Sequence, residues 1–156
     1  MNTFTKWFLL NAVIVTAVFF AEAKGAISLM VKNDVSFLTV VIMSLYVIVS
    51  SWVGRLCYLA DKIEKGMQRR TRERLSRQAE VGWFAAEHFF SLGLLGTVFG
   101  LCVATSTSLT EGNEVSDIVA GLKTGLNTAF YTTICGIVFS LPLQAQLIIL
   151  RFKVEE

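Results

Sequence analysis

The sequence predicts an all-α, polytopic membrane protein with four transmembrane helices, and two observations carry this prediction. A bilayer-spanning helix needs roughly 20 mostly apolar residues, and four windows of the chain come close to that length. Charged residues are sparse in these windows and crowded into one segment between the second and the third. Overall composition adds little, because 54% of the 156 residues are hydrophobic and soluble domains are also about half apolar.

The first two windows run from about Phe4 to Ala21 and from about Val35 to Leu59. Both are apolar nearly all round, a pattern that suits lipid-facing helices. The connection between them, Glu22 to Asp34, is short, so we expect the two helices to form an antiparallel hairpin.

The N-terminal window has an alternative interpretation as a cleaved signal. Lys6, the apolar run and the tripeptide Ala21-Glu22-Ala23 also fit a secretory signal with an A-x-A cleavage site. We expect the window to remain in the protein as a helix, and the signal stays the alternative.

The last two windows run from Phe89 to Ser106 and from Ile118 to Leu150. Glu87 and His88 lie at the threshold of the third window, and Lys123 lies in the first turns of the fourth. The cysteines fall inside the windows without a C-x-x-C pair, so we interpret them as small packing residues; they are Cys57, Cys102 and Cys135. The pattern shows no nucleophile–base pair, metal-ligand cluster or phosphate loop, so we expect neither an enzyme nor a metal or cofactor site.

The placement of charge predicts the topology. The segment Asp61 to Glu80 holds seven Lys and Arg residues, and positive residues that flank spans stay in the cytoplasm. The connection Thr107 to Asp117 carries three acidic residues and no Lys or Arg, as an outside loop should, and Arg151 and Lys153 place the C-terminus inside. We therefore expect two cytoplasmic termini and four units: an N-terminal hairpin (1–60), a basic cytoplasmic connection (61–85), a helix pair (86–150) and a cytoplasmic tail (151–156). The net charge of +2 is too small to suggest nucleic acid as a partner.

Small and hydroxyl-bearing residues share one face of each of the last two windows at helical spacing. The two faces hold Gly93, Gly96, Thr97, Gly100, Ala104, Thr107 and Ser108 on the third window, and Gly121, Gly125, Thr128, Ala129, Thr132, Thr133, Gly136 and Ser140 on the fourth. In lipid such residues let helix backbones approach closely, and helix contact alone is the simplest interpretation of the glycines. Hydroxyl groups can also solvate a passing ion weakly, as conduction requires, so we predict an ion path along Thr97, Thr133, Thr132 and Thr128. Neither window has an ionisable residue near its middle, so a titrating carboxylate would come from another chain.

Two segments carry a resemblance to a known family. Leu94 to Leu101 reads LLGTVFGL, and Gly121 to Ile137, followed by Leu141-Pro142, reads GLKTGLNTAFYTTICGI. Both resemble segments of the MotA/TolQ/ExbB proton-channel subunits, over roughly Phe89 to Ala145. The resemblance implies a homopentamer in the bacterial inner membrane, whose last two helices line a pore around a dimer of single-span partners similar to ExbD, TolR or MotB. Each partner bears a membrane aspartate. The resemblance also implies that Thr97 and Thr133 are pore threonines and that Pro142 is the proline near the cytoplasmic end of the last helix.

The sequence departs from the pattern of this family in two places. Thr128 stands where ExbB and TolQ carry a glutamate, so the mechanism would depend more heavily on the partner's aspartate. MotA also lacks that glutamate and has four spans. Its large cytoplasmic domain, however, is reduced here to about Asp61 to Gly82, so torque on a flagellar rotor is not expected.

The leading functional hypothesis is an ion-channel subunit of a stator, which couples ion flow, expected to be of protons, to mechanical work through a partner. One alternative is a small dimeric secondary transporter, which needs a membrane carboxylate in each subunit and for which Glu22 is the only candidate near a span. The other is a non-conducting membrane scaffold in which the small faces serve packing only. The pattern leaves open which process is energised and whether the ion is a proton or sodium.

Overall fold

The computed structural model describes residues 2–62, 69–108 and 115–155. Five helices make up the regular structure of these ranges: α1 (Thr3–Ala23), α2 (Ala26–Asn33), α3 (Leu38–Lys62), α4 (Arg69–Ser108) and α5 (Val115–Glu155). All of them except α2 are long and apolar enough to cross a membrane. The predicted all-α fold with four long apolar helices is therefore confirmed.

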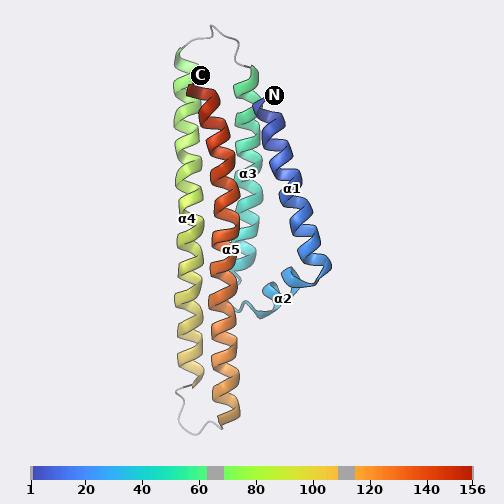
Figure 1. Ribbon diagram of the computed structural model, residues 1–156. Coiled ribbons are helices and arrows are strands. Elements are labelled where there is room, and N and C mark those ends of the chain that lie inside the picture. The colour runs from blue at the N-terminus through green and yellow to red at the C-terminus, as the bar shows by residue number, and fades with distance from the viewer. Residues whose placement is uncertain (1, 63–68, 109–114, 156) are drawn as a thin grey trace.

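Helices α4 and α5 run antiparallel and side by side over their whole length (Figure 1). Helix α3 packs against one half of this pair only, and α1 lies outside α3 and inclines away from it toward α2. Both termini lie at the end of the bundle where α3 ends and α4 begins, whereas α4 ends and α5 begins at the opposite end, beyond α2. The α4–α5 pair is thus longer than the helices that accompany it.

The short helix α2 lies in the connection that we expected to be a simple turn. Gly25 precedes it with a φ of 70°, a left-handed conformation that glycine adopts without steric cost. The chain can therefore change direction directly after α1, and the Glu22 carboxylate accepts hydrogen bonds from Ser28 N (3.1 Å) and Ser28 Oγ (2.6 Å). Buried Asp34 accepts a bond from Thr39 N (2.8 Å) and caps the start of α3. These two carboxylates hold the connection against the ends of α1 and α3.

Helices α4 and α5 extend further than the predicted spans. Helix α4 begins at Arg69, so the part of the basic segment from Arg69 to Glu80 is helical and continues without a break into the third span. The reason is an apolar stripe within that segment, since Leu75 and Ala79 are one turn apart and both buried. Helix α5 holds Pro142 in its interior. Residues 63–68 of the basic connection and 109–114 of the acidic connection lie outside the described residues.

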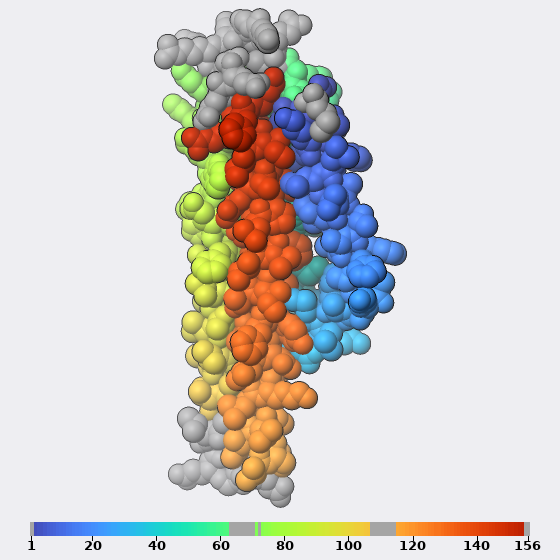
Figure 2. All heavy atoms as spheres, in the orientation of Figure 1, coloured from blue at the N-terminus to red at the C-terminus, as the bar shows by residue number. Residues whose placement is uncertain are grey.

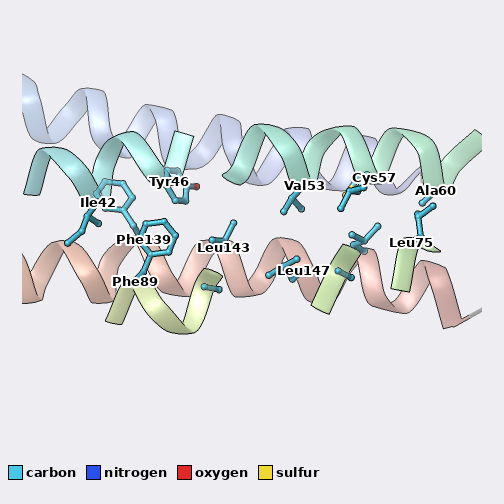
Figure 3. Packing of buried hydrophobic residues seen from close by; sticks show 14 of the residues in the cluster. Ile42, Tyr46, Val53, Cys57, Ala60, Leu75, Phe89, Phe139, Leu143 and Leu147 are labelled. Atoms are coloured by element: carbon cyan, nitrogen blue, oxygen red, sulfur yellow. The ribbon is translucent and has the colours of Figure 1, made fainter. Parts of the chain in front are cut away.

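The hydrophobic core joins α3 to α4 and α5 (Figure 3). The Tyr46 and Phe139 rings meet near the end of the core that holds Ile42 and Phe89, with 4.9 Å between their centroids. The labelled core residues are Ile42, Tyr46, Val53, Cys57 and Ala60 of α3, Leu75 and Phe89 of α4, and Phe139, Leu143 and Leu147 of α5. Cys57 and Cys135 are buried and Cys102 is exposed. Because packing of this kind associates helices in lipid, the core fixes α3 against the α4–α5 pair.

Helix α1 is fastened at its start by a residue from the end of α3. Both oxygens of the Asp61 carboxylate accept bonds from the first backbone amides of α1, Thr3 N (2.9 Å) and Phe4 N (2.7 Å). The residue that precedes the helix, Asn2, makes no capping bond with its side chain. Asp61 therefore caps the N-terminus of α1 although it lies 58 positions away from Thr3 in the sequence.

We predict that Asp61→Asn loosens the first turn of α1. One of the two amides loses its charged acceptor, and loss of a cap costs about 0.5–2 kcal/mol. Hydrogen exchange of the protein in lipid nanodiscs should show faster exchange of the Thr3 and Phe4 amides, while the amides of the α3 core keep their wild-type rates. Glu80→Gln, which neutralises an exposed carboxylate of α4, is the matched control. Unchanged exchange at Thr3 and Phe4 in the Asp61 variant would show that the carboxylate does not cap α1.

Candidate functional site

The small faces of α4 and α5 meet one another within the chain. A Cβ atom placed on Gly100 would lie 2.6 Å from Ala129 N, and one placed on Gly136 would lie 2.7 Å from Phe89 O. At Gly93 it would lie 3.1 Å from Thr132 O. A side chain does not fit at the first two distances and would be tight at the third, so glycine is what allows the two backbones to touch. The glycines of the predicted faces thus form a close helix–helix contact.

Gly125 and Gly96 lie at the same contact between α4 and α5 as these three glycines. A Cβ atom on Gly125 would lie 2.5 Å from Ala104 N, and one on Gly96 would meet the Thr132 side chain. Gly121 is half-buried near the start of α5. Pro142 is half-buried too, but it lies at a cavity between α5 and α1 and not at the contact with α4.

Two threonine hydroxyls meet at the edge of this contact. The hydroxyls of Thr97 and Thr133 touch each other, and both side chains are half-buried. Thr97 Oγ1 also lies 3.2 Å from the carbonyl oxygen of Gly93, and Thr133 Oγ1 lies 2.9 Å from that of Ala129. Two hydroxyls and two carbonyls are therefore gathered at one level, one pair from each helix.

The other two predicted threonines lie deeper. Thr132 is fully buried and donates to the carbonyl of Thr128 at 2.9 Å, one turn back in its own helix. Thr128 is also fully buried and points to the opposite side, where its Oγ1 accepts from Val35 N (3.2 Å) and donates to Asn33 O (3.2 Å). The structure thus brings Thr97 and Thr133 together and places Thr128 at the junction of α2 and α3. An ion path along all four residues stays a prediction.

The face that carries Thr97 and Thr133 is otherwise apolar and exposed. Exposed apolar residues lie before and after the two threonines at helical spacing, on the same faces. They are Phe90, Leu94 and Leu101 of α4 and Leu126, Phe130 and Ile137 of α5. Neither helix offers an acidic residue at this level, since α4 has none after Glu87 and α5 has none between Asp117 and Glu155. The site consists of neutral oxygen atoms within an apolar surface.

The charged residues singled out near the ends of the spans lie apart from the threonine pair. Lys123, Glu87 and His88 are all exposed, and His88 Nδ1 lies 2.6 Å from the carbonyl oxygen of Phe84, one turn earlier in the same helix. Among residues 2–62, 69–108 and 115–155, no group of three His, Cys, Asp or Glu side chains could hold a metal ion together.

A buried polar cluster was not foreseen. Gln146 of α5 is fully buried, and its amide forms bonds with four side chains from α1 and α3. They are Trp7 Nε1 (3.1 Å), Asn11 Oδ1 (3.3 Å), Tyr46 OH (3.2 Å) and Ser50 Oγ (3.0 Å). Polar side chains join helices across a membrane in this way. The sequence hinted at this cluster only by placing Asn11 and Gln146 in apolar windows. The spacing of residues along the sequence did not indicate that the two side chains meet.

A comparison with protein families gives a match over residues 58–156 to a family model described as the MotA/TolQ/ExbB proton channel family. The matched region begins near the end of α3 and includes all of α4 and α5, hence both small faces. Searches of curated proteins and of solved structures give no significant match.

Proposed function

The chain belongs to the MotA/TolQ/ExbB proton channel family, and on this premise we propose that it is the pore-forming subunit of an ion-driven stator in the bacterial inner membrane. In this proposal several copies, expected to be five, form a ring around a dimer of a single-span partner with a membrane aspartate. Ion flow past that aspartate drives mechanical work. Both termini face the cytoplasm, in keeping with their position at the same end of the bundle as the basic start of α4 (Figure 1).

The observation that carries the proposal is the pair of hydroxyls at Thr97 and Thr133. A hydroxyl both donates and accepts a hydrogen bond, so two that touch can pass a proton or share the solvation of a small cation. The pair is half-buried at the edge of the α4–α5 contact, where a group approaching from outside the chain could reach it. Neutral oxygens bind an ion weakly, and weak binding is what allows an ion to leave again.

The absence of an acidic residue beside the pair supports a role for a second chain. Ionisable residues within the membrane mark many proton relays, and α4 and α5 supply no acidic residue at the level of Thr97. The apolar residues around the pair suit a helix from a partner or from another copy as well as they suit lipid. We therefore place the partner's aspartate opposite the two hydroxyls.

We predict that Thr97→Val and Thr133→Val each lower proton transport at least about tenfold. Loss of one hydrogen bond of about 1.4 kcal/mol from the transition state corresponds to that factor. The complex that copurifies with the full chain is reconstituted into liposomes with a pH-sensitive dye inside, and a potassium-diffusion potential drives proton uptake. Thr105→Val is the matched control, because Thr105 is exposed on α4 and, among the residues that the structure describes, its hydroxyl donates to carbonyls of its own helix only, 3.0 Å away at Leu101 and Cys102.

The same assay tests the alternatives. Undiminished uptake in both variants would remove the threonines from the ion path. If the wild-type complex passes no protons in this assay, and no sodium when a sodium-sensitive dye replaces the pH dye, the chain is a scaffold and the small faces serve packing only. Native mass spectrometry of the purified complex gives the number of copies, and a dimer without a single-span partner would favour a transporter.

A further inference from the structure

A cavity opens between α1 and the rest of the bundle. Its volume is about 380 Å3, and residues from α1, α2, α3 and α5 surround it. Figure 2 shows the hollow between α1 and α5, with part of α3 visible behind it. It arises because α1 inclines away from α3 toward its end, so that Val13, Ala17 and Ala21 line one wall while Val138 and Pro142 of α5 line the other.

The cavity is apolar except at one point. Aliphatic and aromatic side chains make up nearly all of its lining, and the exception is Thr39, in the first turn of α3. Thr39 is fully buried, and its hydroxyl has no hydrogen-bond partner within the described residues. The thiol of Cys135 lies beside it, and a hydrogen bond between the hydroxyl and this thiol is weak at most. A buried hydroxyl without a strong partner is costly in lipid, and a carbonyl oxygen inside the cavity would satisfy it.

Two lysines and two carboxylates lie at the α2 end of the cavity. Lys24, directly after α1, and Lys32, in the last turn of α2, are exposed, and the Lys24 ammonium lies 4.9 Å from the centroid of the Phe20 ring. Glu22 accepts hydrogen bonds from Ser28, and buried Asp34 accepts them from Thr39 N and Ser36. The two ammonium groups are therefore the groups at this end of α1 that an anionic group could pair with.

From these observations we infer that the cavity is a binding site for a phospholipid of the surrounding bilayer. One acyl chain fills the apolar space between α1 and α5, an ester carbonyl accepts a hydrogen bond from the Thr39 hydroxyl, and the phosphate pairs with Lys24 and Lys32. The outside of α1 faces the bilayer, so the bound phospholipid comes from the bilayer. This site lies on the α1 side of α5 and is separate from the threonine pair, and it would exist in a channel and in a scaffold alike.

The test is native mass spectrometry of the full-chain assembly, extracted in dodecyl maltoside, stripped of lipid and then titrated with dioleoyl phosphatidylglycerol. We expect one tightly held lipid per chain in the wild type. Ala17→Phe fills the cavity and should lower the bound fraction at least tenfold. Ala12→Phe is the matched control, because Ala12 is exposed on the same helix outside the cavity, and it should bind like the wild type.

A second variant keeps the test informative if the phenylalanine disturbs folding. The double variant Lys24→Gln/Lys32→Gln should weaken binding of phosphatidylglycerol several-fold and leave binding of the uncharged dioleoylglycerol unchanged. The inference is overturned if Ala17→Phe binds lipid like the wild type, if dodecyl maltoside competes equally well for the cavity, or if Ala17→Phe changes the number of chains in the assembly. The last result would show that another copy fills the cavity.

Discussion

Replacing Gly100 with leucine is expected to separate α4 from α5 and to leave little folded protein in the membrane. A Cβ atom at this position would lie 2.6 Å from Ala129 N and 2.5 Å from Gly125 O, so the clash is with backbone and no rotamer change relieves it. Overpacking in a core costs about 1–3 kcal/mol where side chains can shift. We expect a cost above about 3 kcal/mol here, because the helix axes themselves must move apart.

The measurement is the fraction of monodisperse protein after extraction, followed by unfolding in mixed micelles. Cys102→Leu adds comparable bulk two residues later, on an exposed position of the same helix, and should behave like the wild type. Gly100→Ala should fall between the two, with a smaller but measurable loss of stability. A Gly100→Leu protein as stable as the Cys102→Leu protein would mean that α4 and α5 do not touch at this level.

Replacing Gln146 with leucine is expected to release α1 from the bundle and to cost roughly 2 kcal/mol. The Gln146 amide makes four side-chain hydrogen bonds with α1 and α3, and interhelical hydrogen bonds in membranes average about 0.6 kcal/mol each. Leucine nearly preserves the volume, so the loss comes from the polar groups that remain. The Trp7 indole N–H loses its hydrogen-bond acceptor, whereas the hydrogen bond from Ser50 Oγ to Asn11 Oδ1 (3.0 Å) remains.

Unfolding of Gln146→Leu in mixed micelles gives the loss of stability, and hydrogen exchange reports whether α1 in particular is released. Gln144→Leu is the same substitution two residues earlier, where the half-buried amide donates to Ser140 Oγ of its own helix at 3.0 Å and has no other side-chain partner in the described part of the chain. That variant should lose less than 1 kcal/mol, as expected for a single local bond. Equal effects of the two substitutions would show that the buried cluster contributes nothing specific.

The sequence predicts the long helices well because the features that indicate each helix lie within a single window of the chain. Span length, the basic segment before the third span and the small faces at helical spacing are all visible without knowing what lies beside them. The glycines of α4 and α5 could be assigned to a close contact for the same reason. Family resemblance then singled out Thr97 and Thr133 among several threonines, and these are the two whose hydroxyls meet.

What could not be predicted depends on pairs of distant residues. Gln146 and Trp7 are separated by 139 positions, and their meeting depends on the tilt of α1. The same holds for Thr128, which shares a helix face with Thr132 in sequence spacing but bonds the chain between α2 and α3. Helix α2 was missed for a local reason, since eight residues are too few for a periodic signal and the chain reversal depends on the backbone angle of Gly25.

The bonds to Gln146 have a consequence for biosynthesis. Helix α1 leaves the ribosome before α5, so Trp7 is made 139 positions ahead of Gln146, which accepts its indole N–H. Until α5 has entered the membrane, Trp7 and Tyr46 face lipid without that partner, and Asn11 has only Ser50 and its own helix. We expect chains truncated before Gln146 to expose these polar groups to the bilayer. Such chains would offer membrane proteases and chaperones a mark that distinguishes a subunit without Gln146 from one in which α5 is packed in place.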